Sequence, residues 1–477
     1  MITKLLNKPT RALFLGLIIL ESIAFWVYLF PRWSALVWLA IVLITLLLSF
    51  KKLDWGLYII LAELFIGSHG HLLDWQVGGF NISLRLGLFV AVFIVMLYHW
   101  FKNRSQNILA NLPRATWFLA IFIILGIGQG ILKFGIAGSF FDWNAYLYFL
   151  LLPAFLLIKN KDFILNTTRI LLVAVNWLFI KTYILLYIFA HDLQWLDLSL
   201  VYKFIRDTRI GEITYVNKNF WRIFMPAQIW TVIGLIAVVL ILLLAKKNNW
   251  QIIDKWFLWV TLFTSSLTVL ASFSRSNWLG AGLAIGLALI YLVFKKLITG
   301  RRFILASAGL ILLLFLDVIF MFAWTGSWQP QLVSGRLTNL QEQAFDSRQA
   351  QLQPLWYQIS ENFLWGNGFG QTITYQSSDP RIKNEANPSG RYTTYALEWG
   401  YLDIWLKIGL FGLISYLAMI ARVLYKKLNI RQNKPNFWVI NQGLAWGLVA
   451  LVVISIFSPY LNHPLGIGLI LINLSHD

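Results

Sequence analysis

The chain has 477 residues, of which 59% are hydrophobic and only 12% are charged, and its mean hydropathy is +0.69. This composition excludes an ordinary soluble enzyme or binding domain and is typical of a protein with several membrane spans. The formal net charge is +19 and the chain has no cysteine, so disulfides, thiolate nucleophiles and thiolate metal sites are excluded together.

Apolar runs of the length that crosses a bilayer, about 20 residues, recur along the whole chain. They cover residues 12–30, 34–50, 55–68, 84–100, 115–131, 140–158, 168–190, 222–245, 256–271, 278–294, 303–323, 403–420 and 436–458, with a shorter run at 464–474. Because lipid cannot satisfy free backbone N–H and C=O groups, such runs must be helices. The sequence therefore predicts an all-α polytopic membrane protein with roughly 12–14 transmembrane helices. We expect one integral membrane domain over residues 1–477, whose first run is a retained helix rather than a removed signal peptide.

Basic residues cluster in every second loop, and this pattern predicts the topology. The clusters lie within residues 4–11, 51–52, 102–114, 159–169, 246–255, 295–302 and 422–434. By the positive-inside rule these loops are cytoplasmic, which puts the amino terminus inside and the long loop 324–402 outside a cytoplasmic (inner or plasma) membrane. A charge excess spread over many loops does not form one basic face, so we expect no nucleic-acid partner.

Two polar segments fall on the predicted outer side. Loop 324–402 carries Arg336, Arg348, Arg381, Arg391 and Glu398. The smaller segment 191–221 carries Lys203, Arg206, Arg209 and Lys218, with Arg222 just beyond it. We expect the two segments to meet and to hold the chemistry done on a polar substrate.

Charged side chains at membrane depth are costly unless they are paired or hydrated. Arg275 lies in the polar hinge 272–278 between two apolar runs, and it has two interpretations. It is either an interfacial arginine that snorkels beside Trp278, or a guanidinium that lines an outward cavity and binds phosphate oxygens. For the other embedded charges, ion pairing between helices is the simpler expectation; they are Glu63 and Arg85, which suit each other, Asp142 and Lys181.

Two further patterns argue against a metal or nucleotide site. His69 and His71 do not share a helix face, so a metal pair there needs a bend, and interfacial packing or hydrogen bonding is the simpler role. The glycine-rich segment 366–370 lacks the Lys-Ser/Thr of a phosphate-binding loop and a flanking strand, which predicts a turn with positive φ angles instead. We expect no metal and no other cofactor.

Cationic side chains that converge at one outer face suit a lipid-linked pyrophosphate. Such a substrate carries its charge at the headgroup level, with an isoprenoid tail in the bilayer and a sugar in the outer loop. A guanidinium cluster stabilises the negative charge that grows on the leaving diphosphate, and a nearby carboxylate can accept the proton of the attacking hydroxyl.

The residues of the late loop carry a family resemblance. Arg348 to Trp356, then residues 361–370 (ENFLWGNGFG), 398–402 (EWGYL) and 409–413 (GLFGL) resemble the signature of the bacterial O-antigen ligase and polymerase superfamily. The hinge at Ser274-Arg275-Ser276 is similar to a short polar outer turn of that family. The resemblance implies a membrane glycosyltransferase that transfers an undecaprenyl-pyrophosphate-linked glycan to a glycan or lipid-glycan acceptor.

The site residues implied by the resemblance are as follows. Arg275 matches the hinge arginine that binds the diphosphate, and Arg206, Arg209 or Arg222 matches the arginine of the preceding outer segment, with Arg209 preferred. Glu398 falls where the ligases place a histidine, which favours the polymerase-like branches and makes it the candidate base. Arg348, Arg391 and Tyr401 complete the expected substrate-binding set.

Two alternatives from other classes remain open. A flippase or other transporter of lipid-linked oligosaccharides also has many spans and buried cations, but transporters show internal symmetry, and the long outer loop has no counterpart in the other half of the chain. A non-catalytic scaffold of cell-envelope assembly is the other alternative.

Overall fold

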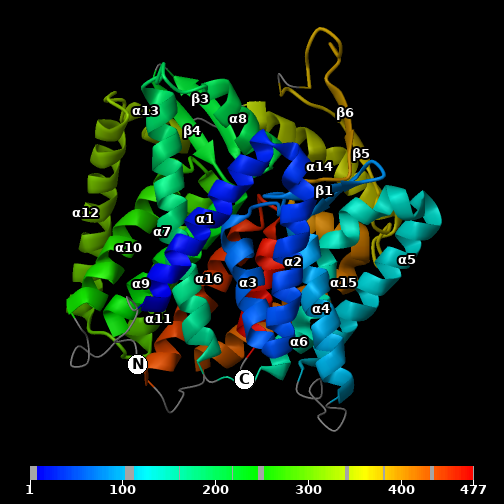
Figure 1. The fold of residues 1–477 in the computed structure, drawn as a ribbon, viewed down its shortest axis with the longest axis horizontal. Coiled ribbons are helices and arrows are strands. Elements are labelled where there is room, and N and C mark those ends of the chain that lie inside the picture. Colours follow the sequence, from blue (N-terminus) through cyan, green and yellow to red (C-terminus); the bar gives the residue numbers. More distant parts are fainter. Residues whose placement is uncertain are drawn as a thin grey trace.

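Helices dominate the computed structural model, which describes residues 8–102, 112–158, 160, 162–217, 219–244, 252–338, 343–379, 382–429 and 435–475 (Figure 1). The long helices are α1 (Lys8–Leu29), α2 (Ser34–Lys51), α4 (Leu84–Lys102), α5 (Arg114–Trp143), α7 (Phe163–Ala190), α9 (Ile229–Leu244), α10 (Ile252–Ala271), α11 (Arg275–Phe294), α12 (Gly300–Trp324), α14 (Gln343–Glu361), α15 (Gly400–Asn429) and α16 (Pro435–Ile454). Shorter helices are α3 (Leu53–Ile66), α6 (Leu152–Leu157), α8 (Leu198–Asp207), α13 (Gln331–Thr338) and α17 (Pro464–Leu474). Short 3-10 helices are η1 (Pro31–Trp33), η2 (Asn144–Leu151), η3 (Pro226–Gln228) and η5 (Tyr460–Asn462).

The all-α, polytopic membrane class is confirmed. Within the described ranges, ten helices are long and apolar enough to cross a membrane, and two apolar helices, Lys255–Ala271 and Pro464–Leu474, are shorter. The short length of these two helices is one reason why the number of long spans is below the predicted twelve to fourteen, and there are two more. The runs at 115–131 and 140–158 belong to one helical stretch, Arg114–Leu157, and the run at 55–68 forms the 14-residue helix α3.

Three antiparallel hairpins were not predicted. They pair β1 (Asp74–Val77) with β2 (Phe80–Ser83), β3 (Glu212–Asn217) with β4 (Phe220–Phe224), and β5 (Ile373–Gln376) with β6 (Arg391–Thr394). The run at 222–245 therefore begins as a strand, and its helical part starts only at Pro226. Aromatic and β-branched residues, which fit a pleated and half-covered surface, explain why these short segments pair as strands.

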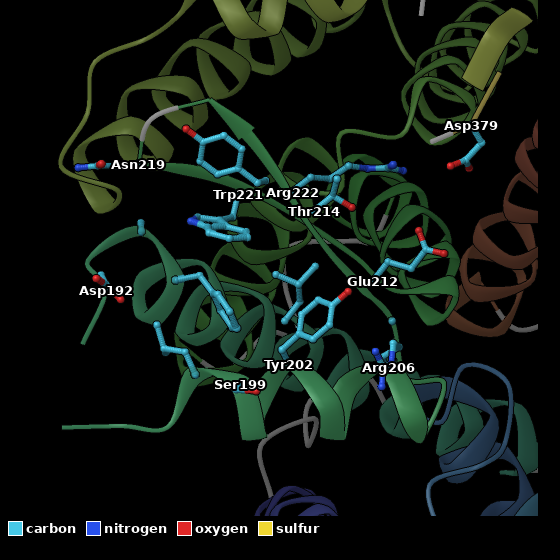
Figure 2. A pocket seen from close by; sticks show the side chains of 16 residues that line it. Asp192, Ser199, Tyr202, Arg206, Glu212, Thr214, Asn219, Trp221, Arg222 and Asp379 are labelled. Atoms are coloured by element: carbon cyan, nitrogen blue, oxygen red, sulfur yellow. The ribbon is translucent and has the colours of Figure 1, made fainter. Parts of the chain in front are cut away.

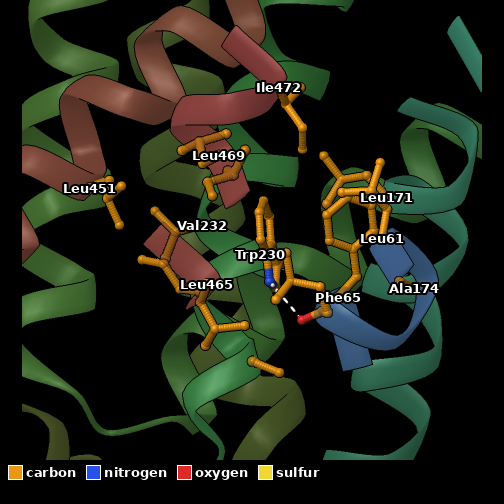
Figure 3. Packing of buried hydrophobic residues seen from close by; sticks show 14 of the residues in the cluster. Leu61, Phe65, Leu171, Ala174, Trp230, Val232, Leu451, Leu465, Leu469 and Ile472 are labelled. Carbon is orange, nitrogen blue, oxygen red and sulfur yellow. Dashed lines mark hydrogen bonds between the residues drawn. The ribbon is translucent and has the colours of Figure 1, made fainter. Parts of the chain in front are cut away.

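The helix α9 is the most buried of the ten membrane-length helices in the described ranges. Of the residues in its membrane-length stretch within Pro226–Leu244, 83% are buried, compared with 6% for α12, which therefore lies at the periphery. Figure 3 shows Trp230 of α9 packed among Phe65, Leu465 and Leu469, with its indole Nε1–H donating to the Leu64 carbonyl at 3.1 Å. A buried indole needs such a partner, so this bond fixes how α9 and α3 meet.

The two ends of the helix bundle differ in character. Both termini lie at one end, and the hairpins, α13 and α14 lie at the other (Figure 1). Since α1 leaves the end with the termini and α2 returns to it, the basic turn at 51–52 lies there; the turn at 295–302, where α11 ends and α12 begins, lies there too. This segregation agrees with the charge pattern, while the assignment of that end to the cytoplasm stays a prediction.

Candidate active site

The polar hinge between α10 and α11 is a rigid turn. Ser274 caps α11 by accepting the Asn277 N–H, as serine commonly does at a helix start. Phe273 has a φ of +47°, and the Trp278 indole donates to the Val269 carbonyl at 2.8 Å, which ties the two helices together across the turn. Arg275 is therefore the first residue of α11, held at the end of the bundle opposite the termini.

Three arginines from separate elements gather around this hinge. Arg222 of β4 donates from Nε to the Ser272 carbonyl at 3.1 Å, and Arg336 of α13 donates from Nε to the Phe273 carbonyl at 3.1 Å. Arg275 donates from Nε to the Arg336 carbonyl at 2.7 Å. We refer to Arg222, Arg275 and Arg336 as the hinge arginines; all three are half-buried. The Nε–H bonds orient each planar guanidinium, and two of the accepting carbonyls belong to neighbouring residues of the turn, Ser272 and Phe273.

The start of α15 and the hinge flank the same turn, residues 455–459. The hydroxyls of Ser276 and Ser458 lie 3.1 Å apart. The Trp399 ring packs on Phe457, with 5.7 Å between ring centroids. A Cβ on Gly400 would lie 2.3 Å from the Ser455 carbonyl oxygen, so only glycine permits this approach. The segments that carry Arg275 and Glu398 therefore both contact this short turn.

Glu398 forms an ion pair with Arg348 of α14. The two side chains are 43% and 35% exposed, so a substrate can reach the carboxylate. The Glu398 backbone N–H donates to the Gln351 amide oxygen at 3.3 Å, and the Trp399 indole donates to the Arg348 carbonyl at 2.9 Å. Consecutive turns of α14 therefore position the Glu398 segment.

The apolar residues of this loop pack at two separate places. The Trp365 ring packs against Phe122 and Phe411. The apolar side of α14 packs elsewhere in the loop. Leu355 and Ile359 are buried in a small core with residues of the outer loop and α15, namely Ile373, Tyr375, Leu397 and Leu406.

The other predicted site residues are dispersed. Tyr401 uses its hydroxyl to bind the Val452 carbonyl at 2.6 Å, which holds α15 against α16. Arg391 is exposed on β6, opposite Gln376. Arg206 is exposed on α8, pairs with Asp207 at 2.9 Å and lies over the Tyr202 ring at 5.7 Å. Arg209 follows α8 with a φ of +51°.

A cavity of about 1310 Å³ is lined by residues of the segment 191–221 and by Asp379 of the loop 324–402, so these two segments approach each other here, as the sequence predicted. It lies between α8 and the β3–β4 hairpin, and Asp379 of the long loop reaches its edge (Figure 2). Arg206 and Arg222 line it, so Arg222 belongs both to the cavity and to the hinge arginines.

His69 and His71 both have protein partners. His71 binds Asp74 at 2.9 Å, and His69 Nδ1 lies 3.3 Å from His463 Nε2. Burial by surrounding atoms, then the positive charge of Arg85 and the neighbouring His71 and Arg209, lower the pKa of His69 to about 4. Among the residues that the structure describes, no group of three or more His, Asp or Glu could hold a metal ion. Arg209, which the sequence analysis preferred as the diphosphate-binding arginine of the segment 191–221, therefore lies near His69, on whose pKa its charge acts.

Buried ion pairs join helices inside the bundle. Arg85 donates two hydrogen bonds to Glu63, at 2.8 and 2.9 Å, which confirms the predicted pair, and Lys181 binds Glu21 at 2.6 Å. The sequence analysis missed a third group, in which Lys407 binds Asp142 of α5 and Asp403 of its own helix. The signal was present, since Asp403 and Lys407 are four residues apart in an apolar run.

The third group also anchors the long loop 324–402. Asp142 accepts the Gly370 N–H at 2.7 Å, and Lys407 donates to the Tyr395 carbonyl at 3.2 Å. Between them, the Phe369 N–H donates to the Gly126 carbonyl at 3.1 Å and the Gly368 N–H to the Lys407 carbonyl at 3.2 Å. Gly366, Gly368 and Gly370 have φ angles of +82°, +87° and +91°, which confirms the predicted glycine turn. The segment is thus wedged between α5 and α15.

Comparison with known proteins identifies one domain. Residues 260–417 match the family model described as O-antigen ligase. The matched range runs from α10 into α15 and contains Arg275, Arg336, Arg348 and Glu398, whereas Arg222 and the residues of α8 and β3 lie before it. A search of curated proteins finds no match to the chain.

Proposed function

Because the match over residues 260–417 supports the O-antigen ligase and polymerase superfamily that the sequence resembles, we propose that this membrane protein is a glycosyltransferase of that type. It transfers a glycan from an undecaprenyl-pyrophosphate carrier to a sugar hydroxyl, at the outer face of the cytoplasmic membrane. The product is a longer lipid-linked chain or a glycan on a different acceptor. The observation that carries the proposal is the gathering of the hinge arginines around the turn 272–275.

The hinge arginines suit the diphosphate of the donor. Guanidinium groups bind phosphate oxygens through pairs of N–H donors, and three arginines from separate elements lie around the turn to which the headgroup would bind. In the reaction the bond between the anomeric carbon and a diphosphate oxygen breaks while the acceptor oxygen bonds to that carbon. The negative charge that develops on the diphosphate is stabilised by the guanidinium groups, which take the role that a metal ion has in other transferases.

Glu398 suits the acceptor side of the reaction. Its carboxylate is partly exposed, so it can accept the proton that the acceptor hydroxyl loses. Arg348 acts through Glu398 as a positioning residue, because the ion pair holds the carboxylate in one orientation. A general base contributes about 10²- to 10⁴-fold to such a rate, so its removal is easily measured.

Reconstitution with a lipid-linked repeat unit tests the proposal. The wild-type protein should produce longer lipid-linked chains or transfer the glycan to an added acceptor. Arg275→Lys, which keeps the charge but loses the planar fork, should lower the rate about 10-fold or more, because charge-assisted hydrogen bonds contribute about 1.5–3 kcal/mol each. Arg301→Lys, at the opposite end of the bundle, is the matched control and should leave the rate unchanged.

Two results would reject the proposal. A wild-type protein that gives no transfer after reconstitution, together with glycan assembly in cells that is unchanged in Arg275→Lys and Glu398→Gln at equal membrane abundance, would leave a scaffold as the better interpretation. Movement of the lipid-linked unit across the membrane without any glycosidic bond formation would identify a flippase.

The orientation can be tested separately, because the chain has no cysteine. Ser389→Cys lies in the exposed outer loop, and Lys295→Cys lies in the turn that follows α11. A membrane-impermeant maleimide added to intact cells, or to spheroplasts if an outer membrane is present, should label only the first. Labelling of the second alone would reverse the proposed topology.

A further inference from the structure

Two histidines from distant parts of the chain form an ordered series of hydrogen bonds. His463 precedes α17, and its Nδ1 accepts the Leu465 N–H at 3.2 Å. Nδ1 is therefore unprotonated, so in a neutral ring the hydrogen is on Nε2, which lies 3.3 Å from Nδ1 of His69. His69 Nδ1 accepts this hydrogen bond, which leaves the hydrogen of a neutral His69 ring on its own Nε2. The pair thus presents one N–H group, at His69.

The N–H group of His69 is available to a ligand. The His69 side chain is exposed, and none of the residues that the structure describes forms a hydrogen bond with its Nε2. Burial by the protein atoms around the ring, then the charge of Arg85, lower its pKa to about 4, so the ring is neutral at neutral pH and is a poor base. His69 therefore suits a ligand atom that accepts a hydrogen bond.

Arg209 adds a positive charge beside this N–H group. Ser68 donates from its hydroxyl to the Ile210 carbonyl at 2.6 Å, and this bond joins the residues adjacent to His69 and Arg209. The Arg209 side chain is exposed, and its guanidinium has no ion pair with any residue in the described part of the chain. A hydrogen-bond donor next to an uncompensated cation suits an anionic oxygen.

The backbone around both residues is held in a strained conformation. Ser68 and Arg209 have φ angles of +49° and +51°, which residues other than glycine rarely adopt. Arg85, itself bound to Glu63, donates to the Ser68 carbonyl at 2.8 Å, and the Ser68 hydroxyl accepts the Ala227 N–H at 3.3 Å. Strain that several contacts maintain in this way is typical of ligand-binding sites.

This pair of residues is separate from the hinge arginines but is connected to the same turn. In the hairpin, Arg222 is opposite Thr214, whereas Arg209 precedes the first strand pair. The turn 455–459, which contacts the hinge and the start of α15, continues through η5 to His463. Asn462, next to His463, donates to Asp403 in the first turn of α15. The segment that carries Glu398 therefore has contacts toward both groups of cations.

We propose that His69 and Arg209 form a second phosphate site, which binds the diphosphate of a lipid-linked acceptor. The inference rests on the proposed function, in which the hinge arginines bind the diphosphate of the donor. It makes the reaction a polymerisation, because the accepting glycan is itself carried by a prenyl diphosphate. Phosphate oxygens accept the His69 N–H and the guanidinium N–H groups of Arg209, and no bond breaks at this site. His463 is a positioning residue, because it determines which nitrogen of His69 carries the hydrogen.

Counting bound lipids tests the second site without any turnover. Native mass spectrometry of the purified protein with undecaprenyl diphosphate should show two bound molecules in wild type. His69→Leu and Arg209→Asn should each bind one, and asparagine is chosen because it tolerates a positive φ. The matched controls are His191→Gln and Arg32→Gln, whose side chains are exposed elsewhere, and they should bind two. One bound molecule in wild type, or two in both site variants, would overturn the inference.

Kinetics with two modified substrates distinguish the acceptor from the donor. A lipid-linked repeat unit whose acceptor hydroxyl is methylated can only donate, and one with a carbon atom in place of the glycosidic oxygen can only accept. His69→Leu and Arg209→Asn should raise KM for the second about tenfold, because a charge-assisted hydrogen bond is lost, and KM for the first by less than about twofold. A KM that rises for the methylated donor alone would assign the site to the donor and overturn the proposal.

The role of His463 has a spectroscopic readout. Nitrogen NMR of isotope-labelled histidine should show the hydrogen of His69 on Nε2 in wild type and on either nitrogen in His463→Leu. His69→Gln, whose amide also offers an N–H, should recover most of the acceptor affinity that His69→Leu loses. A wild-type His69 with its hydrogen on Nδ1, or equal losses in His69→Gln and His69→Leu, would overturn the proposed role of this N–H group.

The two proposals fail in distinguishable ways. If the reconstituted wild-type protein forms no glycosidic bond, the proposed function fails, whatever number of lipids it binds. If transfer occurs while His69→Leu and Arg209→Asn keep two bound lipids and the wild-type KM for the acceptor, only the second phosphate site is wrong.

Discussion

Replacing Lys407 by methionine should destabilise the protein and loosen its outer loop. The Lys407 ammonium group lies between Asp142 and Asp403, and all three side chains are at most 5% exposed. Methionine fills a similar volume but leaves two carboxylates facing each other without their cation. Asn462 still donates to Asp403, and the Gly370 N–H still donates to Asp142, so neither carboxylate loses every partner.

The expected magnitude follows from this burial. Removing one partner of a buried ion pair costs about 3–5 kcal/mol, because an uncompensated charge remains in a dry environment. With an unfolding entropy of about 2 cal/mol/K per residue over 477 residues, this corresponds to a melting temperature about 3–5 °C lower if the chain unfolds cooperatively. The triple variant Asp142→Asn/Asp403→Asn/Lys407→Met should recover part of the loss, since it removes the unpaired charges as well.

Thermal unfolding of purified protein in nanodiscs measures the effect, with Arg422→Met on the exposed side of the same helix as the control. Hydrogen exchange gives a local readout, because the Gly370 amide and the Tyr395 carbonyl are both bound by this group. Amides near 366–370 should exchange faster in Lys407→Met. A melting temperature within about 1 °C of wild type, together with unchanged exchange there, would refute the account of Lys407 as the link between α5, α15 and the loop.

Three other predictions concern the site and its support. Arg348→Ala should lower the transfer rate about 3- to 10-fold, which is small for the loss of a charged hydrogen bond because the ion pair with Glu398 is partly exposed. Its effect should not add to that of Glu398→Gln, because Arg348 acts through Glu398. Additive losses of rate in a double-mutant cycle would show that the two residues act independently. The pKa of His69, about 4, lies below the usual 6.5, so this side chain binds fewer protons in the folded protein than in the unfolded chain, and its contribution to the free energy of unfolding is fully present above pH 6.5 and is lost as the pH falls toward 4. The melting temperature of the wild type should therefore fall more steeply between pH 6.5 and pH 4 than that of His69→Gln. Parallel plots of melting temperature against pH would contradict the lowered pKa. Gly409→Ala should sharply reduce the amount of protein in the membrane, because φ at Gly409 is +73° and the new Cβ would lie 2.2 Å from the Leu364 carbonyl oxygen. Gly282→Ala, whose Cβ would meet nothing within 4 Å, is the control and should be expressed normally. Equal abundance of the two variants would refute the structural requirement for glycine at position 409.

The helical architecture could be predicted because its cause is local. Runs such as 168–190 and 303–323 are apolar along their whole length, and a chain in lipid can satisfy its backbone in such a run only as a helix. The pair Glu63 and Arg85 could be predicted for a similar reason, since an embedded charge needs an opposite charge. The hairpins were missed because strands such as 212–217 form only against a partner, and no span-length signal marks them.

The candidate site could be predicted only in part. Arg275 stood out because a cation interrupts apolar sequence, and Glu398 because of the motifs around it. Arg336 did not stand out, since a single arginine in a polar loop looks like a solvated charge until its Nε–H is seen on the Phe273 carbonyl. Likewise, nothing along the chain showed that Arg222, rather than Arg209, is the arginine of the early outer segment that reaches the hinge.

By itself, the sequence determined that this chain spans a membrane many times, which stretches are helical, and which loops share a side, because hydrophobic length and charge segregation act within about 20 residues. The tertiary structure alone decided which arginines meet at the hinge, that Arg348 holds Glu398, and that Lys407 fastens the outer loop between α5 and α15. The physical reason is that such contacts join residues tens to hundreds of positions apart. They depend on how the helices pack and on where glycines let two backbones approach. Helix packing and backbone approach are properties of the whole fold, and no single segment encodes them.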